Sequence, residues 1–147
     1  MVDAALLAAK ISMIRDAVAR ISTVLPVTLN QFESDRTARE VITLNLFVAI
    51  QECVALASHL LADAGWGTPK TYGESFPALA EHKVVDVELA TRLRAAAGLR
   101  NLLAHQYGAI DIRRLYEFAD ARTSDLTAYC SAVAAWCQTQ NSGTDYR

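Results

Sequence analysis

The stretch LNLFVAIQECVALASHLL, residues 44–61, decides the fold that this sequence predicts. It is apolar on almost every side of a helix, and one strip of it has apolar residues at helical spacing: Leu46, Ile50, Val54, Ala57 and Leu61. A helix that is apolar all round must be covered by other elements. We therefore predict that residues 35–64 form the most buried helix of a helical bundle.

The segment before this stretch also has helical spacing. Its apolar residues recur at alternating steps of four and three, which is typical of a bundle helix: Leu7, Ile11, Ile14, Val18, Ile21 and Leu25. Pro26 interrupts this first helix, and Ser34 is predicted as the N-cap of the long second one. The breaker Gly65-Trp66-Gly67-Thr68-Pro69 is predicted to end that second helix.

The second half of the chain predicts further helices. We expect a short helical turn over residues 76–80 and a helix over residues 87–107, with Gly108 as its C-terminal cap. Asp111 is the predicted N-cap of a last helix, whose apolar residues are Leu115, Phe118, Leu126, Tyr129, Val133 and Trp136. The sequence thus predicts an all-α, up-and-down bundle of four to five helices, with one domain over residues 1–140 and a polar tail over residues 141–147.

The composition is that of a one-domain globular protein, with 147 residues, 52% of them apolar and 20% charged. No uninterrupted apolar run approaches the roughly 18 residues of a membrane span, and the first residues lack the basic start of a signal peptide. Cys53, Cys130 and Cys137 lie in apolar sequence and are predicted as small buried side chains. We expect a cytoplasmic protein, and no metal site because no paired Cys or His spacing occurs.

Charge is unevenly distributed along the chain. Residues 92–114 have five arginines and one acid, a balance of +4 that leaves −6 for the rest of a chain of net charge −2. Such a positive region on an acidic body could attract a polyanion. The alternative is that these arginines are solvated helix-face residues, which is at least as well favoured for Arg113 and Arg114.

The segment most informative about function is Arg100-Asn101-Leu102-Leu103-Ala104-His105-Gln106-Tyr107. A site that cleaves a phosphodiester without a metal needs a fixed cation for the phosphate and a group that moves a proton near neutral pH. Arg100 and His105 have these two properties. Short motifs also occur by chance, so a purely structural role for His105 is the alternative from the segment alone.

The spacing within this segment does not by itself bring its side chains together. Arg100 and Tyr107 are nearly two helical turns apart and share a face if the helix continues. His105 is offset from Arg100 by about 140° on an ideal helix. Convergence of the three side chains would need the long arginine side chain, a frayed last turn or a second chain.

The chain resembles the HEPN superfamily, and specifically its HepT-type toxins, which have an Arg-x4-His-x-Tyr motif near the end of a late helix. Here the motif is complete as Arg100, His105 and Tyr107, and Asn101 occupies the often polar position after the arginine. The similarity covers most of residues 5–130 and includes three further segments: Leu44-Asn45-Leu46, Gly67-Thr68-Pro69 and Gly98-Leu99-Arg100-Asn101.

The resemblance implies a metal-independent ribonuclease with no cofactor. The 2′-hydroxyl of the RNA would attack the adjacent phosphorus and leave a 2′,3′-cyclic phosphate. His105 would act as general base or acid, and Arg100 would stabilise charge on the phosphoryl oxygens. Asn101 could orient the phosphate or the imidazole. The family commonly forms homodimers in which two copies of the motif flank one cleft, so the resemblance also implies a second chain.

The resemblance further implies a protein partner, an MNT-type nucleotidyltransferase that serves as antitoxin in a type VII toxin–antitoxin system. Transfer of AMP to Tyr107 would add bulk and negative charge where an RNA phosphate must sit. Tyr107 could also position RNA, or be an amphipathic residue at a helix end. Asp35 is an acid near the start of the second helix, where the family often has one near the cleft, although any helix N-terminus favours an acid.

The resemblance leaves room for a second function. Some members of the superfamily keep the fold without nuclease activity, and such a chain would be a helical module that binds and regulates a nucleotidyltransferase. The intact set of Arg100, His105 and Tyr107 favours the ribonuclease, because a pure binding module has no need of it.

Overall fold

The computed structural model describes residues 3–105 and 110–143, which form seven α-helices. The helices are α1 (Ala4–Val24), α2 (Leu29–Ser34), α3 (Arg36–Ala64), α4 (Ser75–Glu81), α5 (Val87–His105), α6 (Ile112–Ala121) and α7 (Thr123–Ser142). The predicted all-α class is confirmed, and α4 is the short helix expected near residues 76–80.

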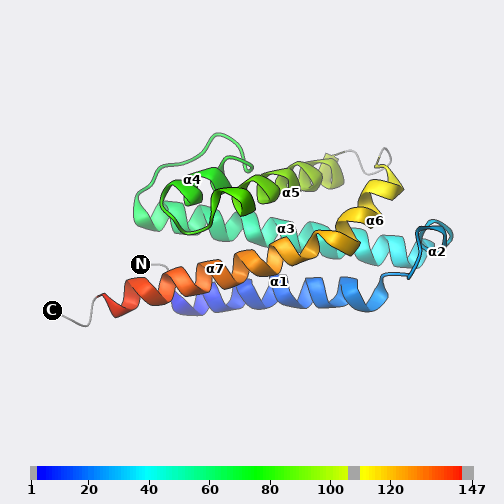
Figure 1. Cartoon of the computed structure of the whole chain (residues 1–147), viewed down its shortest axis with the longest axis horizontal. Helices are drawn as coiled ribbons and strands as arrows, with labels where there is room; N and C mark the ends of the chain where they lie inside the picture. Colours follow the sequence, from blue (N-terminus) through cyan, green and yellow to red (C-terminus); the bar gives the residue numbers. More distant parts are fainter. Residues whose placement is uncertain (1–2, 106–109, 144–147) are drawn as a thin grey trace.

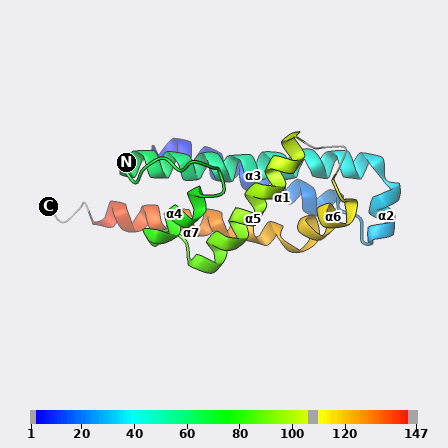
Figure 2. The same cartoon turned by 90° about the horizontal axis from the view of Figure 1, so that it is seen from above.

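The four long helices α1, α3, α5 and α7 alternate in direction, as in an up-and-down bundle (Figure 1). The shorter helices α2, α4 and α6 lie in the three connections between them. Helices α2 and α6 contact each other at one end of the bundle, whereas α4 lies against α5. Figure 2 shows that α5 crosses α3 at an angle. The C-terminal end of α5 therefore lies over the middle of the bundle, which places the described part of the predicted motif there.

Helix α3 is the central element of the bundle, as predicted from residues 44–61. It contacts each of the other six helices described, and the whole predicted apolar strip is buried: Leu46, Ile50, Val54, Ala57 and Leu61. By length and composition alone α3 could also cross a membrane. The core helix of a folded bundle meets the same criteria, and half of its most apolar window is buried inside the molecule.

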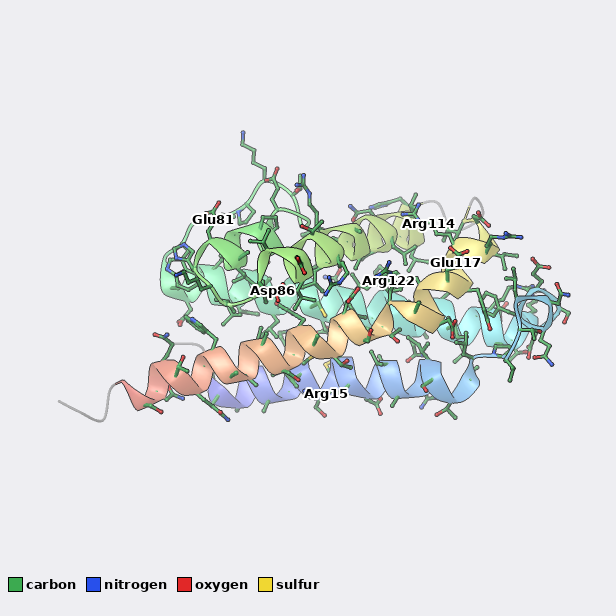
Figure 3. All side chains as sticks on the ribbon, viewed as in Figure 1. Arg15, Glu81, Asp86, Arg114, Glu117 and Arg122 are labelled. Atoms are coloured by element: carbon green, nitrogen blue, oxygen red, sulfur yellow. The ribbon has the colours of Figure 1, made fainter. Side chains whose placement is uncertain are left out.

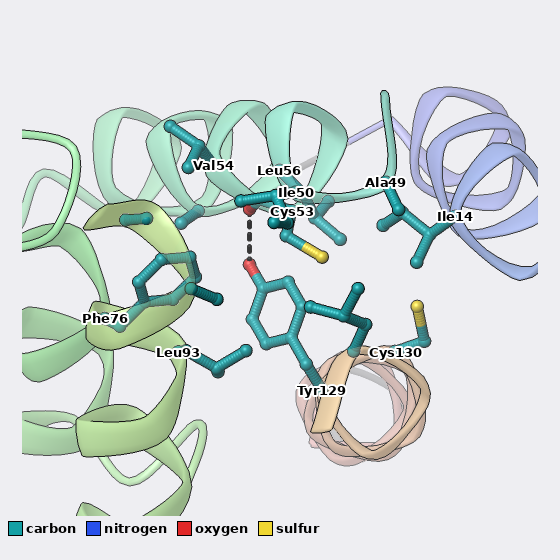
Figure 4. Packing of buried hydrophobic residues seen from close by; sticks show 14 of the residues in the cluster. Ile14, Ala49, Ile50, Cys53, Val54, Leu56, Phe76, Leu93, Tyr129 and Cys130 are labelled. Carbon is teal, nitrogen blue, oxygen red and sulfur yellow. Dashed lines mark hydrogen bonds between the residues drawn. The ribbon is translucent and has the colours of Figure 1, made fainter. Parts of the chain in front are cut away.

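A fully buried tyrosine closes the core between α3, α4 and α7 (Figure 4). The Tyr129 hydroxyl donates a hydrogen bond of 3.0 Å to the backbone carbonyl of Cys53. Phe76 meets the Tyr129 ring edge-on, with the ring centroids 5.5 Å apart. An unpaired buried hydroxyl would be costly. The bond to Cys53 thus allows a large amphipathic side chain to fill the core.

The long central helix begins later than predicted, and Ser34 is not its N-cap. Ser34 is the last residue of α2, and the carboxylate of Asp35 caps α3 by accepting a hydrogen bond of 3.0 Å from the backbone N–H of Ala38. The reason is a capping box of Thr28 and Gln31, which starts α2 in the preceding segment. Because α2 occupies the residues up to Ser34, the cap passes to Asp35.

The last predicted helix is two helices, α6 and α7, which meet at Arg122. Asp111 is the N-cap of α6, as predicted. Thr123 and Ser124 are weak helix formers directly after Arg122, and the bend lets α6 contact α2 while α7 contacts α1. Helix α7 ends at Ser142, inside the segment predicted as a tail. The predicted cap Gly108 lies outside the described residues.

The three cysteines are free thiols. Cys53 and Cys130 are buried, as predicted, and Cys137 is partly buried. Burial raises the pKa of Cys130 to about 11 and that of Cys53 well above its ordinary value. These two thiols therefore stay protonated near neutral pH and pack as small apolar side chains.

Candidate active site

The last two turns of α5 contain the described part of the predicted motif. Arg100, Asn101 and His105 lie on this helix, whose bounds end at His105. Tyr107 lies outside the described residues, in the stretch between α5 and α6. The described site therefore consists of a guanidinium, an amide and an imidazole on α5, with contacts from α3 and from the loop before α4.

Arg100 is held from α3 by a neutral amide. Its Nε donates a hydrogen bond of 2.7 Å to Oε1 of Gln51, and its Nη1 donates one of 3.0 Å to Oδ1 of Asn101. Helices α5 and α3 run in opposite directions and contact each other, which brings position 100 beside position 51. The two bonds fix the direction of the guanidinium and do not involve its Nη2.

Two aromatic rings also contact the guanidinium of Arg100. Its central carbon lies 4.9 Å from the ring centroid of Tyr72 and 5.3 Å from that of Phe47, distances at which a cation is attracted to a π face. None of the ion pairs between described residues includes Arg100. The surroundings thus hold a cation in place and, as far as the described chain extends, leave its charge uncompensated.

The loop between α3 and α4 brings Tyr72 to α5. Gly65 ends α3 in the left-handed region, with φ 72°, which glycine adopts without strain. Further along the loop, Gly73 lies so close to α5 that a Cβ added to it would be 3.3 Å from Cγ of Arg94. A residue without a side chain therefore lets the loop backbone lie directly on α5. Tyr72, its neighbour in the chain, contacts Arg100 from there.

His105 and Arg100 do not meet within one chain. His105 is exposed, and its imidazole forms no hydrogen bond with a described residue. Helix α5 continues through both positions, so the offset of about 140° expected from ideal geometry applies. The Arg100 side chain points toward α3. The Asn101 side chain is exposed and accepts a hydrogen bond from Arg100. The structure thus brings Arg100 and Asn101 together and leaves His105 separate.

Asp35 is not part of this cluster. It is the exposed N-cap of α3, and its carboxylate accepts the Ala38 N–H. Phe47, which contacts Arg100, follows twelve residues later on the same helix, about 18 Å away at the rise of an α-helix. The capping bond explains an acid at this position, and a supporting role at the cleft would require a second protomer.

The predicted positive region is only partly available to a ligand. Arg92 pairs with Asp125 of α7 at 2.8 Å, so it has a structural partner. Arg113 and Arg114 are exposed in the first turn of α6, where Figure 3 labels Arg114. Their exposure agrees with the alternative interpretation, that they are solvated helix-face residues.

Three side chains around Arg100 were not singled out by the sequence pattern, namely Phe47, Gln51 and Tyr72. Phe47 and Gln51 are one turn apart on α3, and a glutamine within an apolar stretch is a signal that could have indicated a contact between helices. Tyr72 has no such signal, because its position depends on the path of the loop. Among the described residues, no group of three His, Cys, Asp or Glu side chains is arranged to bind a metal ion.

A family model described as ribonuclease HepT-like matches residues 14–133 of the sequence. The chain belongs to the HepT-like ribonuclease family. This HepT-like chain is 25% identical over 126 residues to an mRNA nuclease HepT of Shewanella oneidensis, a match that covers 86% of the chain and 94% of that protein. It is 30% identical over 66 residues to a tRNA nuclease HepT of Aphanizomenon flos-aquae, over 45% of each protein.

Solved structures share the fold of the HepT-like chain. A tri-AMPylated Shewanella oneidensis HEPN toxin in complex with MNT antitoxin matches with a TM-score of 0.81 at 25% identity, over 88% of this chain and 97% of that one. The cytosolic protein YutE of Bacillus subtilis, of unknown function, matches with a TM-score of 0.68 at 17% identity, over 88% and 91%. The first of these similarities confirms the resemblance to HEPN toxins, and the second concerns the fold alone.

Proposed function

We propose that this HepT-like protein is the ribonuclease toxin of a toxin–antitoxin system and that AMP transfer from an MNT-type nucleotidyltransferase switches it off. The observation that carries the proposal is the setting of Arg100, a cation held by a neutral amide and two aromatic rings. A cation with no carboxylate partner among the described residues is suited to bind a phosphate. The similar nucleases of Shewanella oneidensis and Aphanizomenon flos-aquae act on mRNA and tRNA.

In the proposed reaction the RNA supplies its own nucleophile, and no metal or cofactor takes part. The 2′-hydroxyl attacks the adjacent phosphorus, and the bond from phosphorus to the 5′-oxygen breaks, which leaves a 2′,3′-cyclic phosphate and a 5′-hydroxyl. Arg100 stabilises the negative charge on the phosphoryl oxygens. His105 accepts the proton of the 2′-hydroxyl or donates one to the leaving 5′-oxygen, and water carries out the other of these two proton transfers. Asn101 orients the phosphate or the imidazole.

Two chains are proposed to form one cleft. Within one chain, His105 is offset from Arg100 by about 140° around α5. In a homodimer with two-fold symmetry, His105 of one protomer can approach Arg100 of its partner. Leu44 supports such an interface, because it is 63% exposed and lies one turn before Phe47 on α3. A contiguous apolar patch around it would be typical of an interaction surface.

Tyr107 is the proposed acceptor of AMP. It follows His105 by two positions and lies outside the described residues. AMP on its hydroxyl would add bulk and a negatively charged phosphate to the motif and compete with the RNA phosphate. One similar structure is a tri-AMPylated toxin bound to its MNT antitoxin, which supports the same regulation here. We expect the protein in the cytoplasm, where RNA is available and free thiols stay reduced.

The test of the ribonuclease proposal is RNA cleavage in EDTA, with analysis of the product ends. We expect cyclic phosphates from the wild-type protein and loss of cleavage in His105→Ala. The matched control is His59→Ala, because His59 is also exposed but lies on α3 toward its C-terminal end. If unmodified protein cuts neither mRNA nor tRNA, the ribonuclease proposal fails, and the inactive module that binds a nucleotidyltransferase is favoured instead.

The test of regulation uses the partner enzyme directly. Incubation with the cognate nucleotidyltransferase and ATP should add AMP to Tyr107, as read by mass spectrometry of the peptide, and should stop cleavage. Tyr107→Phe should keep the protein unmodified at that residue and insensitive to the partner. Continued inhibition of Tyr107→Phe in the presence of ATP would place the regulated residue elsewhere.

A further inference from the structure

We infer that Phe47, Gln51 and Tyr72 position Arg100 for the reaction, and that Tyr72 acts on the rate through Arg100 and not through contact with RNA. We call these three residues the Arg100 cradle. The inference rests on the proposed function, which it deepens by naming the side chains that set the geometry of the phosphate-binding cation.

Gln51 fixes the guanidinium without neutralising it. Its amide oxygen accepts the Nε–H of Arg100 at 2.7 Å. A carboxylate at the same position would hold Arg100 equally well, but it would cancel the charge that a phosphate needs. A neutral acceptor therefore gives a fixed direction to a long and flexible side chain while its charge stays available for the substrate.

Tyr72 restrains Arg100 from the side of the loop. Its ring centroid lies 4.9 Å from the guanidinium carbon, and its backbone carbonyl accepts the N–H of Ser75 at 3.2 Å, in the first turn of α4. The next residue, Gly73, lies against Arg94 on α5. The backbone on the C-terminal side of Tyr72 is thus fixed to α4 and α5, so the ring is a firm support for Arg100 and not a freely moving loop residue.

Tyr72 is 47% exposed, which raises the question of whether its ring stacks on a base. Base stacking is a common use of exposed aromatic residues in RNA-binding proteins. The contact with Arg100 favours positioning, because the ring lies against the cation. The two roles predict different behaviour in a double-mutant cycle.

The test measures single-turnover cleavage rates and RNA affinities of Tyr72→Leu, Gln51→Leu and Tyr72→Phe, each alone and combined with Arg100→Lys. We expect Tyr72→Leu and Gln51→Leu to slow cleavage by about 10-fold, because a small misplacement of a catalytic group has effects of this order or larger. Tyr72→Phe keeps the ring and should stay within about 2-fold of the wild type. In the Arg100→Lys background, neither leucine variant should cause a further loss.

Independent losses that multiply in the Arg100→Lys background would overturn the inference and show that the residues act on RNA directly. The matched control for Gln51→Leu is Gln138→Leu, an equivalent change at an exposed position on α7, which should leave the rate unchanged. Thermal unfolding of every variant separates a local effect from loss of the fold.

A second measurement decides the inference without any RNA. The Nε–H resonance of Arg100, identified by its loss in Arg100→Lys, should be shifted and protected from exchange in the wild type because Gln51 accepts this proton. Gln51→Leu and Tyr72→Leu should move it toward the position and exchange rate of a free arginine. A resonance unchanged in both variants contradicts the cradle. Failure of the wild type to cut RNA would instead count against the proposed function alone.

Discussion

Two neighbouring residues on α3, Gln51 and Glu52, hold cations from two different helices. Glu52 pairs with Lys10 of α1 at 2.8 Å, and both side chains are largely buried, with 17% and 16% of their surface exposed. Gln51 accepts the Nε–H of Arg100 of α5 at 2.7 Å. The two contacts are similar in length and differ in one respect, the charge of the acceptor.

The difference in acceptor charge shows that α3 stabilises the fold through Glu52 and holds a candidate site residue through Gln51. A lysine taken from water into the interface of α1 and α3 needs an anion, since an unpaired buried charge is costly. Arg100 has an amide and two aromatic rings in place of that anion. Its charge is therefore held in position, and on the proposed function the RNA phosphate supplies the balancing negative charge.

The largest expected effects on cleavage and on stability come from replacing Arg100 and Lys10, respectively, by alanine. Arg100→Ala should lower RNA cleavage by at least about 100-fold, as expected for the loss of a group that stabilises developing charge, with little change in stability. Lys10→Ala should leave cleavage by the folded protein unchanged. It should lower the free energy of unfolding by about 1–3 kcal/mol, because Glu52 loses its partner. Urea unfolding and single-turnover cleavage of both variants test this, and equal losses of activity would contradict it.

A change of acceptor charge tests the comparison more directly. Gln51→Glu should pair with Arg100, compete with the RNA phosphate and weaken RNA binding by about 10-fold, with no loss of thermal stability. The matched change Glu52→Gln, one residue further on, should leave RNA binding unchanged and lower stability. RNA affinity from a filter-binding or anisotropy titration separates the two, and unaltered binding by Gln51→Glu would refute the role of the neutral acceptor.

A smaller effect is expected at the arginine of α5 that does have an acid partner. Arg92 pairs with Asp125 at 2.8 Å, and 41% of the Arg92 side chain is exposed. Arg92→Ala should therefore lower the free energy of unfolding by no more than about 1 kcal/mol and leave the cleavage rate unchanged. Thermal unfolding beside a cleavage assay would show this, and a large loss of activity would mean that Arg92 also binds RNA.

The smallest effect concerns the buried thiol of Cys130 on α7. The pKa of Cys130 rises from an ordinary 9.0 to about 11 because burial disfavours the thiolate. A raised pKa in the folded state means that the stabilising contribution is complete below pH 9 and is lost as the pH rises toward 11. The melting temperature should fall over this interval, and should fall less in Cys130→Ala. An identical fall in both proteins would assign the effect to other groups.

The fold could be predicted where local pattern and tertiary burial agree. Residues 44–61 are apolar on almost every side, and a helix of this kind is stable in a folded bundle only where other helices cover it. The exact start of that helix was predicted wrongly because Thr28 and Gln31 form a capping box in a segment too short for any periodicity. The break at Arg122 was missed for a related reason, since apolar spacing continues across it from α6 to α7.

The site could be predicted only in part. Arg100 and His105 were predicted from their chemistry and from the resemblance of their motif to HepT-type toxins, signals that lie within α5, and their roles stay predictions. Phe47 and Tyr72 reach Arg100 from α3 and from a loop, so their roles depend on helix packing and on the path of the chain past Gly73. No spacing rule connects positions so far apart in sequence, and only the assembled bundle shows that they surround one side chain.

Because α3 contacts each of the other helices described, loss of its packing would uncover a part of every one of them. We expect it to open as one cooperative unit instead of by stages. For a nuclease this has a consequence in the cell, where proteases degrade proteins from their open states. Opening of α3 would separate Gln51 and Phe47 from Arg100 together, so on the proposed function a molecule that opens for degradation would lose its cleavage activity before a protease cuts it.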